Sequence, residues 1–142
     1  MKKNRLATVY PFDFELIGIV SSSKEYKLAW HLNQLNVFHL IKEEDIKIEF
    51  SDNRQIRVSN LMEETDHSKV HLLKNKLVSA NSSINQFLVQ ELQQFDYLLK
   101  LVNHTEENWA DSLMIRLKDI SVIDYALKLD IDKIRMRDNL LF

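Results

Sequence analysis

The 142-residue sequence contains no cysteine, one glycine (Gly18) and one proline (Pro11). Without cysteine the chain has no disulfide, no thiolate nucleophile and no thiolate ligand for zinc or an iron–sulfur cluster. Walker loops, dinucleotide fingerprints and Gly-x-Ser-x-Gly nucleophile elbows all need more than one glycine. A single glycine therefore excludes their standard forms. Turns must rely instead on Asn, Asp and Ser, which tolerate left-handed backbone conformations.

Long apolar runs and an excess of one charge are also missing. The longest dense apolar run covers residues 16–20, whereas a transmembrane helix needs roughly 18 or more apolar residues. The basic residues 1–5 are followed by the sequence YPFD at 10–13 and not by the apolar region of a signal peptide. Lys and Arg total 19, and Asp and Glu total 21, so the net charge is −2 and no densely basic face is expected. We therefore expect a cytoplasmic protein that binds neither a membrane nor nucleic acid.

The chain has enough apolar residues to build one core. Hydrophobic residues make up 45% of the sequence. At 16.9 kDa, a compact fold buries about two-thirds of the surface that the unfolded chain exposes. We therefore expect a single domain spanning residues 1–142 that is stable without disulfides.

The spacing of apolar residues predicts strands and helices along the whole chain. Alternation predicts strands over residues 6–20, 46–50, 56–58, 70–78, 87–89, 95–102 and 121–129, although 70–78 also fits a helix. The segment 95–102 is apolar on both faces, which is typical of a central strand. Helices are predicted over 24–36 and 106–119, with hydroxyl caps from Ser21 to Ser23 and from Thr105. A polar loop is expected over 79–86, and the apolar tail 130–142 is expected to dock on the domain.

This order of elements predicts an α+β fold. The segment DYLLKL at 96–101 recurs as DYALKL at 124–129, with the predicted helix 106–119 between the two copies. Their offset of 28 residues is near the length of a strand–helix–strand unit. We expect a mainly antiparallel sheet with two helices on one face, in an elaborated ferredoxin-like arrangement.

The segment VQELQQFDY, residues 89–97, resembles the signature of the IPExxxVDY family, a group of small Bacteroidetes proteins. Glu91, Asp96 and Tyr97 match the signature, while Val89 and Phe95 stand where the family has Ile and Val. Position 90 departs from the pattern, because it is Gln where the family has Pro. The resemblance extends over residues 12–19, 26–30 and 139–142. It implies a bacterial cytoplasmic protein and no catalytic activity, since the family is named after its motif and has no assigned function.

The motif residues Glu91, Asp96 and Tyr97 are the candidate binding residues. Alternation in the predicted strand puts Tyr97 on the same face as Phe95 and Leu99, and puts Asp96 on the opposite face. A carboxylate at the end of a central strand is costly unless it is hydrogen-bonded. One interpretation is that the two carboxylates accept backbone N–H groups of the connector 92–94 while Tyr97 packs in the core. The other is that all three residues form a polar binding rim at the end of the sheet.

Histidines and aromatic residues supply further candidates. His67 and His71 are four residues apart, a spacing that suits a metal on a helix, but this segment is predicted as loop and strand. We therefore expect no metal and no cofactor. Trp30 and His31 are interpreted as a partly buried aromatic edge of the first helix, with a stacking or partner-binding role as the alternative. Residues 133–137 are interpreted as a solvated turn, with an anion or partner contact as the alternative.

Two functions fit these expectations, and neither is enzymatic. The first is an interaction or regulatory module that pairs with itself as a homodimer, or with another cytoplasmic protein. It rests on the sheet face opposite the helices, which would be open and apolar if it carries Ile46, Phe50, Val58 and Leu72. The alternative is a metabolite sensor of ferredoxin-like architecture. Its small-molecule ligand would bind near Glu91, Asp96 and Tyr97 or at a dimer interface.

Overall fold

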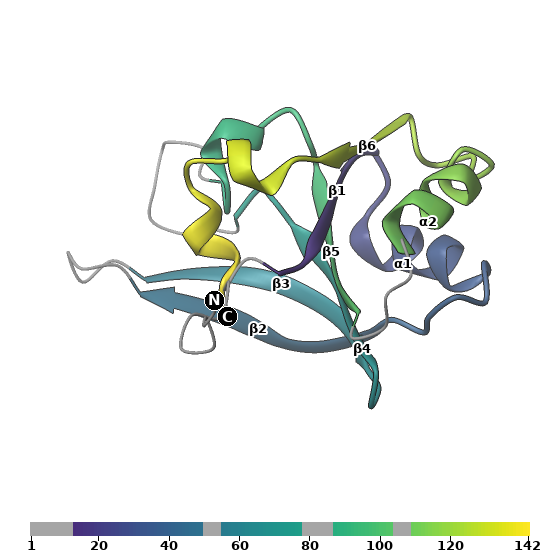
Figure 1. Ribbon diagram of the computed structural model, residues 1–142, viewed down its shortest axis with the longest axis horizontal. Coiled ribbons are helices and arrows are strands. Elements are labelled where there is room, and N and C mark those ends of the chain that lie inside the picture. Colours follow the sequence, from purple (N-terminus) through teal and green to yellow (C-terminus); the bar gives the residue numbers. More distant parts are fainter. Residues whose placement is uncertain (1–12, 50–54, 78–86, 104–108) are drawn as a thin grey trace, which may run out of the picture.

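The computed structural model describes residues 13–49, 55–77, 87–103 and 109–142 and has an α+β architecture (Figure 1). Over these residues a six-stranded antiparallel sheet is combined with two α-helices and three short 3-10 helices. In chain order the elements are β1 (Glu15–Val20), α1 (Glu25–Asn33), β2 (Ile41–Glu49), β3 (Gln55–Glu64), β4 (Ser68–Lys74), η1 (Gln90–Leu92), β5 (Tyr97–Asn103), α2 (Trp109–Leu117), β6 (Tyr125–Leu129), η2 (Ile131–Lys133) and η3 (Arg137–Leu140).

The strand order in the sheet is β2-β3-β4-β5-β1-β6, and every neighbouring pair is antiparallel. Strand β5 lies between β4 and β1, which confirms the prediction of a central strand there. Strands β2 and β6 form the two edges of the sheet. The first half of the chain thus supplies one edge, and the segment after α2 supplies the other.

Both α-helices cover one face of the sheet, as predicted. They contribute the buried residues Leu28, Ala29 and Leu32 from α1 and Ala110, Leu113 and Leu117 from α2. These pack on alternate strand residues of that face, which include Ile17, Ile19, Val70, Leu72, Leu99 and Leu101. Because successive side chains of a strand point to opposite faces, this cluster uses only half of each strand.

The opposite face is also covered, so the expectation of an open apolar face is wrong. Its buried cluster joins Leu16, Val58, Leu73 and Leu98 of the strands to Leu88, Leu92, Phe95, Ile131, Ile134 and Leu140. The cover therefore consists of segment 87–95 and the C-terminal segment, which lie on the side away from α1 and α2 in Figure 1. Ile46 and Val58 belong to this cluster, Leu72 belongs to the helix side, and Phe50 lies outside the described residues. Docking of the tail is confirmed.

Several predicted boundaries differ from the structure. Strand β2 begins at Ile41, well before the predicted residue 46, because its first part, residues 41–45, is exposed on both faces and needs no apolar alternation. The expected strand 87–89 is reduced to one bridge between Phe87 and Lys76, followed by η1. The final strand begins at Tyr125 and not at residue 121, and segment 68–74 is a strand. Residues 6–12, the loop 79–86 and the Thr105 cap lie outside the described residues.

The serine cap of α1 is a further correction. The N-cap residue is Lys24, and no side chain caps the first turn. The buried hydroxyl of Ser21 instead donates to the Val122 carbonyl at 2.6 Å and accepts the Ser23 N–H at 3.2 Å. Its burial directs this hydroxyl to the connection between α2 and β6, where it satisfies a main-chain oxygen.

The single glycine has a packing role. A Cβ atom at Gly18 would lie 2.6 Å from two atoms of the Phe95 ring, closer than any ordinary contact. Gly18 thus lets the aromatic ring of the covering segment lie directly on β1. The turn after α1 uses Asn36 with φ of 59°, so an asparagine takes a left-handed position that glycine often fills.

Candidate functional site

The candidate residue Asp96 closes the turn that follows β1. Its carboxylate oxygen Oδ2 accepts the Ser21 N–H at 2.9 Å. Its own N–H donates to Ile19, and its carbonyl accepts the N–H of Asn75. The side chain is exposed, so the interaction is a surface cap on a main-chain donor.

Tyr97 lies on the helix side of the sheet and is buried. Its hydroxyl donates to the Ser23 carbonyl at 2.6 Å and ties β5 to the residues just before α1. Burial raises the pKa of Tyr97 to about 12, and the nearby carboxylates of Glu25 and Asp96 add to the effect. The phenol therefore stays protonated over the physiological range and acts as a hydrogen-bond donor.

Glu91, the third candidate, contacts a different part of the chain. Its Oε1 atom accepts the Met136 N–H at 2.6 Å and fastens the C-terminal segment to η1. Asp96 and Tyr97 both engage residues 21–23, whereas Glu91 engages the segment after β6. The carboxylates do accept main-chain N–H groups, but their partners lie far away in the sequence and not in the connector 92–94. The three side chains do not converge on one site.

A polar group beside Tyr97 was not anticipated. Ser59 of β3 donates to Glu25 Oε1 at 2.5 Å and accepts a hydrogen bond from Lys42 at 2.8 Å. Lys42 also pairs with Asp45 at 3.1 Å. The other carboxylate oxygen of Glu25, Oε2, is buried and has no hydrogen-bond partner. Glu25 Oε2 could therefore accept one additional hydrogen bond, and a single free acceptor does not make a ligand site.

The second unanticipated group lies on the face covered by the C-terminal segment, at the centre of the sheet. Lys100 of β5, His71 of β4 and Asn60 of β3 are only 6%, 4% and 3% exposed. Lys100 and His71 are directly opposed across the two strands. The Nδ1 atom of His71 lies 2.8 Å from the side-chain oxygen of Asn60. We call these three residues the Lys100 cluster.

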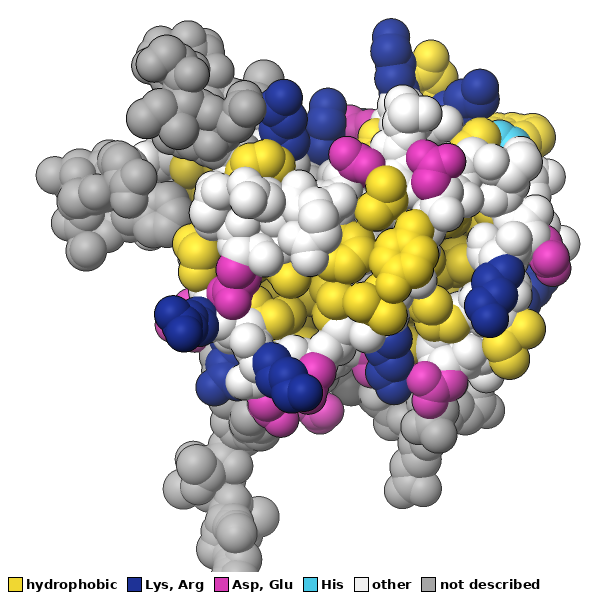
Figure 2. Space-filling model, turned by 90° about the horizontal axis from the view of Figure 1, so that it is seen from above, with side chains coloured by type: hydrophobic (Ala, Val, Ile, Leu, Met, Phe, Trp, Pro, Cys, Tyr) yellow, Lys and Arg dark blue, Asp and Glu magenta, His cyan; other side chains and the backbone are white. Residues whose placement is uncertain are grey.

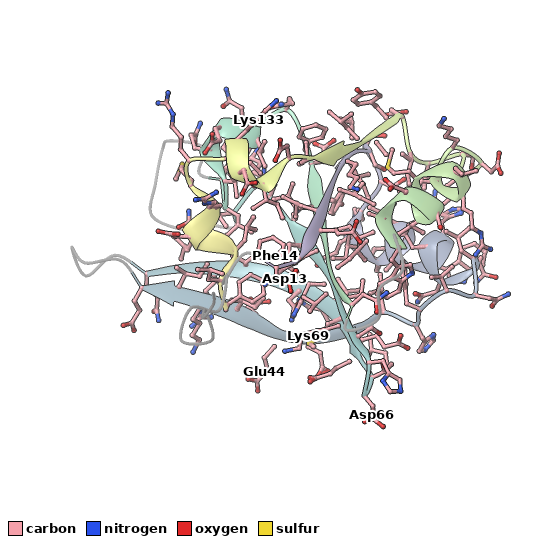
Figure 3. The ribbon with its side chains drawn as sticks, viewed as in Figure 1. Asp13, Phe14, Glu44, Asp66, Lys69 and Lys133 are labelled. Carbon is pink, nitrogen blue, oxygen red and sulfur yellow. The ribbon has the colours of Figure 1, made fainter. Side chains whose placement is uncertain are left out.

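Aromatic rings surround the Lys100 ammonium group. Its Nζ atom donates to the Leu140 carbonyl at 2.6 Å. It also lies 4.7 Å from the centre of the Phe14 ring and 4.2 Å from that of Phe142. The Phe142 ring makes an edge contact with His71, with 5.1 Å between ring centres. Figure 3 labels Phe14 beside the beginning of β1 and Lys69 on β4, two of the residues around the cluster.

The electrostatics of the Lys100 cluster favour neutral side chains. Burial, with a smaller contribution from Lys69, lowers the pKa of Lys100 to about 8. Burial also lowers the pKa of His71 to about 4, and the charges of Lys100 and Lys69 add to it. No salt bridge joins Lys100 to a carboxylate within the described part of the chain. The Lys100 ammonium group is therefore buried among two aromatic rings, one carbonyl and a neutral imidazole.

The other candidate side chains remain separate. His67 lies in the exposed turn before β4, so it does not pair with the buried His71. Over residues 13–49, 55–77, 87–103 and 109–142, no group of three metal-ligating side chains occurs. Trp30 is 58% exposed, more than predicted, and its ring contacts that of His31 edge-on. Lys133 is exposed after β6.

The two edges of the sheet differ in chemistry. Strand β2 carries six charged residues among its nine and is interrupted by a register shift between Glu43 and Ile46. Ile46 and Ile48 are half-buried against the core, and the rest of the strand is exposed. Charges and bulges of this kind protect an edge from further strand pairing. Strand β6 instead exposes Tyr125 (53%) and Leu127 (42%). Figure 2 looks down on this edge and shows apolar side chains gathered over it.

A cavity of about 250 Å³ lies next to this edge, between α2 and β6. Its lining is mainly apolar and consists of Met114, Leu117, Lys118, Ile123, Asp124, Tyr125 and Ala126. The nearby Lys128 pairs with Asp111 at 3.1 Å and with Glu15 at 3.4 Å, which ties β6 to α2 and β1. The β6 edge is thus held firmly to the domain while its apolar side chains stay exposed.

Comparison with family models, with curated proteins and with solved structures found no match to this chain. None of the helices formed by the described residues has the length and apolar character that a membrane crossing requires.

Proposed function

We propose that this protein is a non-catalytic interaction module that self-associates through β6. The observation that carries the proposal is the contrast between a charged, irregular edge at β2 and an edge with exposed Tyr125 and Leu127 at β6. An edge strand offers unpaired main-chain groups, and an apolar edge offers buried area as well. A second copy can use both through the same strand, which gives a closed dimer.

The proposed architecture is a ferredoxin-like unit with an insertion. Without β2 and β3, the chain order is β1-α1-β4-β5-α2-β6 and the sheet order is β4-β5-β1-β6. The β2–β3 hairpin would then be an insertion between α1 and β4. The resemblance of residues 89–97 to the IPExxxVDY signature, and the cytoplasmic location that it implies, are parts of the same proposal.

One register of the β6–β6 pairing is favoured by charge and polarity. A two-fold axis perpendicular to the sheet keeps both faces continuous, so each residue must oppose a residue of the same face. With the axis at Ala126, Tyr125 opposes Leu127 of the second copy and Asp124 opposes its Lys128. With the axis at Leu127, Asp124 would oppose Asp130, and like charges would repel. The first register therefore places two apolar pairs and two ion pairs in the interface.

Light scattering during size-exclusion chromatography tests the proposal. The wild type should show a mass near twice 16.9 kDa at micromolar concentration, and Leu127→Asp should return it to the single-chain value. Ile41→Asp is the matched control, because Ile41 is 55% exposed on the opposite edge strand. A wild type that stays at the single-chain mass up to about millimolar concentration would refute the proposal, and so would a Leu127→Asp variant that remains dimeric.

A charge exchange tests the register itself. Asp124→Lys should weaken the dimer, because it opposes Lys128 of the other copy. The double variant Asp124→Lys with Lys128→Asp should restore much of the affinity, because opposite charges again face each other. Thermal melting of each variant is needed as a control, since Lys128 also pairs with Glu15 and Asp111 within the chain. A double variant weaker than both single variants would exclude this register.

The motif residues give little support to the alternative function, a metabolite sensor. Glu91, Asp96 and Tyr97 each bind a different main-chain group and point to different segments. A ligand at that position would have to displace these contacts. The Lys100 cluster is the better place to look for a small-molecule site.

A further inference from the structure

We propose that the Lys100 cluster is a binding site for an aromatic carboxylate, and that the chain's own Phe142 ring occupies part of it in this structure. The inference is independent of self-association through β6, because Lys100 lies on an inner strand. Three features of the cluster support it: Lys100 has donors to spare for an acidic oxygen, the Phe142 ring marks a place for an aromatic ring, and that ring is held by partly exposed residues.

The oxygen position is set by Lys100. Its ammonium group carries three N–H donors, yet the described residues supply a single oxygen acceptor, the Leu140 carbonyl at 2.6 Å. A neutral carbonyl compensates a buried cation poorly, whereas a carboxylate would supply a charge-assisted hydrogen bond and the missing counter-charge. Lys69, on the same strand as His71, adds positive charge nearby, part of which its ion pair with Glu64 at 3.9 Å offsets.

The ring position is set by Phe142. Its ring lies over the Lys100 ammonium group at 4.2 Å and against the edge of His71 at 5.1 Å. Phe14 contributes a second ring at 4.7 Å from the same nitrogen. A ligand ring in place of Phe142 would keep these contacts. The site is therefore shaped for a molecule that joins one aromatic ring to one acidic oxygen by a short linker.

The Phe142 ring can leave the site without unfolding of the domain. Leu141 and Phe142 are 40% and 42% exposed, so neither is a fully buried core residue. The preceding residues are fastened separately, because Asn139 donates to the Leu88 carbonyl at 2.7 Å and Met136 donates to Glu91 at 2.6 Å. Leu140 is fully buried and is the last residue of η3, so it stays in place with its carbonyl on Lys100. Movement limited to Leu141 and Phe142 would uncover the ammonium group on the side of the Phe142 ring.

Titration of the full-length protein with 3-phenylpropanoate, followed by amide chemical shifts, tests the proposal. Saturable shifts should centre on His71, Lys100 and residues 140–142. The neutral isostere 3-phenylpropanamide should bind at least about tenfold more weakly, because it lacks the charge that Lys100 requires. Equal binding of acid and amide, or the absence of saturable shifts, would overturn the proposal.

Variants separate the site from the built-in occupant. Lys100→Met should abolish binding of the acid, while Lys133→Met, which removes an exposed lysine, should leave it unchanged. Phe142→Ala should tighten binding several-fold, because the competing ring is gone. Lys100→Gln serves as a second variant in case Lys100→Met alters the fold. Binding that survives both Lys100 substitutions would overturn the site, and binding unaffected by Phe142→Ala would overturn the role of the Phe142 ring.

Discussion

Replacing Lys100 by Met should stabilise the protein near neutral pH. Burial lowers the pKa of Lys100 from 10.5 to about 8, so burying the charged form costs about 3 kcal/mol. Met has a similar length and no charge to desolvate. The substitution leaves the Leu140 carbonyl without its donor and removes two cation–π contacts, which together cost about 1–2 kcal/mol. The net expectation is a gain of about 1–2 kcal/mol.

The pH dependence of this gain follows from the same shift. Below about pH 8, Lys100 is charged in both the folded and the unfolded chain, so the wild type carries the full penalty. Between about pH 8 and 10.5 the folded protein releases its proton first. The unfolded chain then binds more protons, and the wild type becomes relatively more stable as the pH rises. The difference between Lys100→Met and the wild type should therefore shrink over this interval.

Urea unfolding followed by circular dichroism at several pH values measures this difference. Lys133→Met is the control, because Lys133 is exposed and its removal should produce no pH-dependent gap. A Lys100→Met variant that is clearly less stable than the wild type at about pH 7 would refute the reasoning. That result would mean that the rings and the carbonyl outweigh the desolvation of the ammonium group.

Three further predictions concern single side chains. Gly18→Ala should destabilise the fold by about 1–3 kcal/mol in urea unfolding, because its Cβ would meet the Phe95 ring at 2.6 Å, and Phe95→Leu should relieve part of that loss. Tyr97→Phe and Asp96→Ala should each cost about 1 kcal/mol, since each removes one hydrogen bond to the chain before α1, and unchanged melting of both variants would contradict this. Acid should destabilise the wild type between about pH 6.5 and 4, by at most about 3 kcal/mol, because the unfolded chain protonates His71 before the folded protein does. His71→Gln should flatten that part of the stability curve.

The parts of the fold that local patterns govern could be predicted from the sequence. The apolar segment around Leu98 and Leu99 became a central strand, and the helical spacing around Leu113 became α2. The charged beginning of β2 was missed, because an edge strand with both faces in water has no apolar alternation. Residues 87–89 do not form the predicted strand, because a short apolar run in the sequence does not distinguish a strand from a segment that covers a sheet.

For the candidate site, the sequence could predict the type of hydrogen bond that the carboxylates make but not the residues that donate to them. Asp96 and Glu91 accept main-chain N–H groups, as one interpretation held, but Ser21 and Met136 come close only in the folded chain. The Lys100 cluster was missed, because a lysine in a strand normally marks the solvent side. A signal was nevertheless present. Lys100 lies within a segment predicted to be central and covered on both faces, where a charged side chain should have no access to water.

The type of cover over each face of the sheet explains why a buried lysine occurs on one face and not on the other. The helix side is closed by regular helices, whereas the side of Lys100 is closed by short 3-10 helices and connecting segments. Such segments have few internal hydrogen bonds and open locally at low free energy. A buried ammonium group that opposes folding is easiest to retain beneath a cover of this kind, because local opening gives it access to water or to an anion. The amides of Leu141 and Phe142 should therefore exchange with solvent much faster than those of β5, and an aromatic carboxylate should speed their exchange further. Slow exchange at these two residues, comparable to that of β5, would show that the cover is permanent and that Lys100 is only a structural residue.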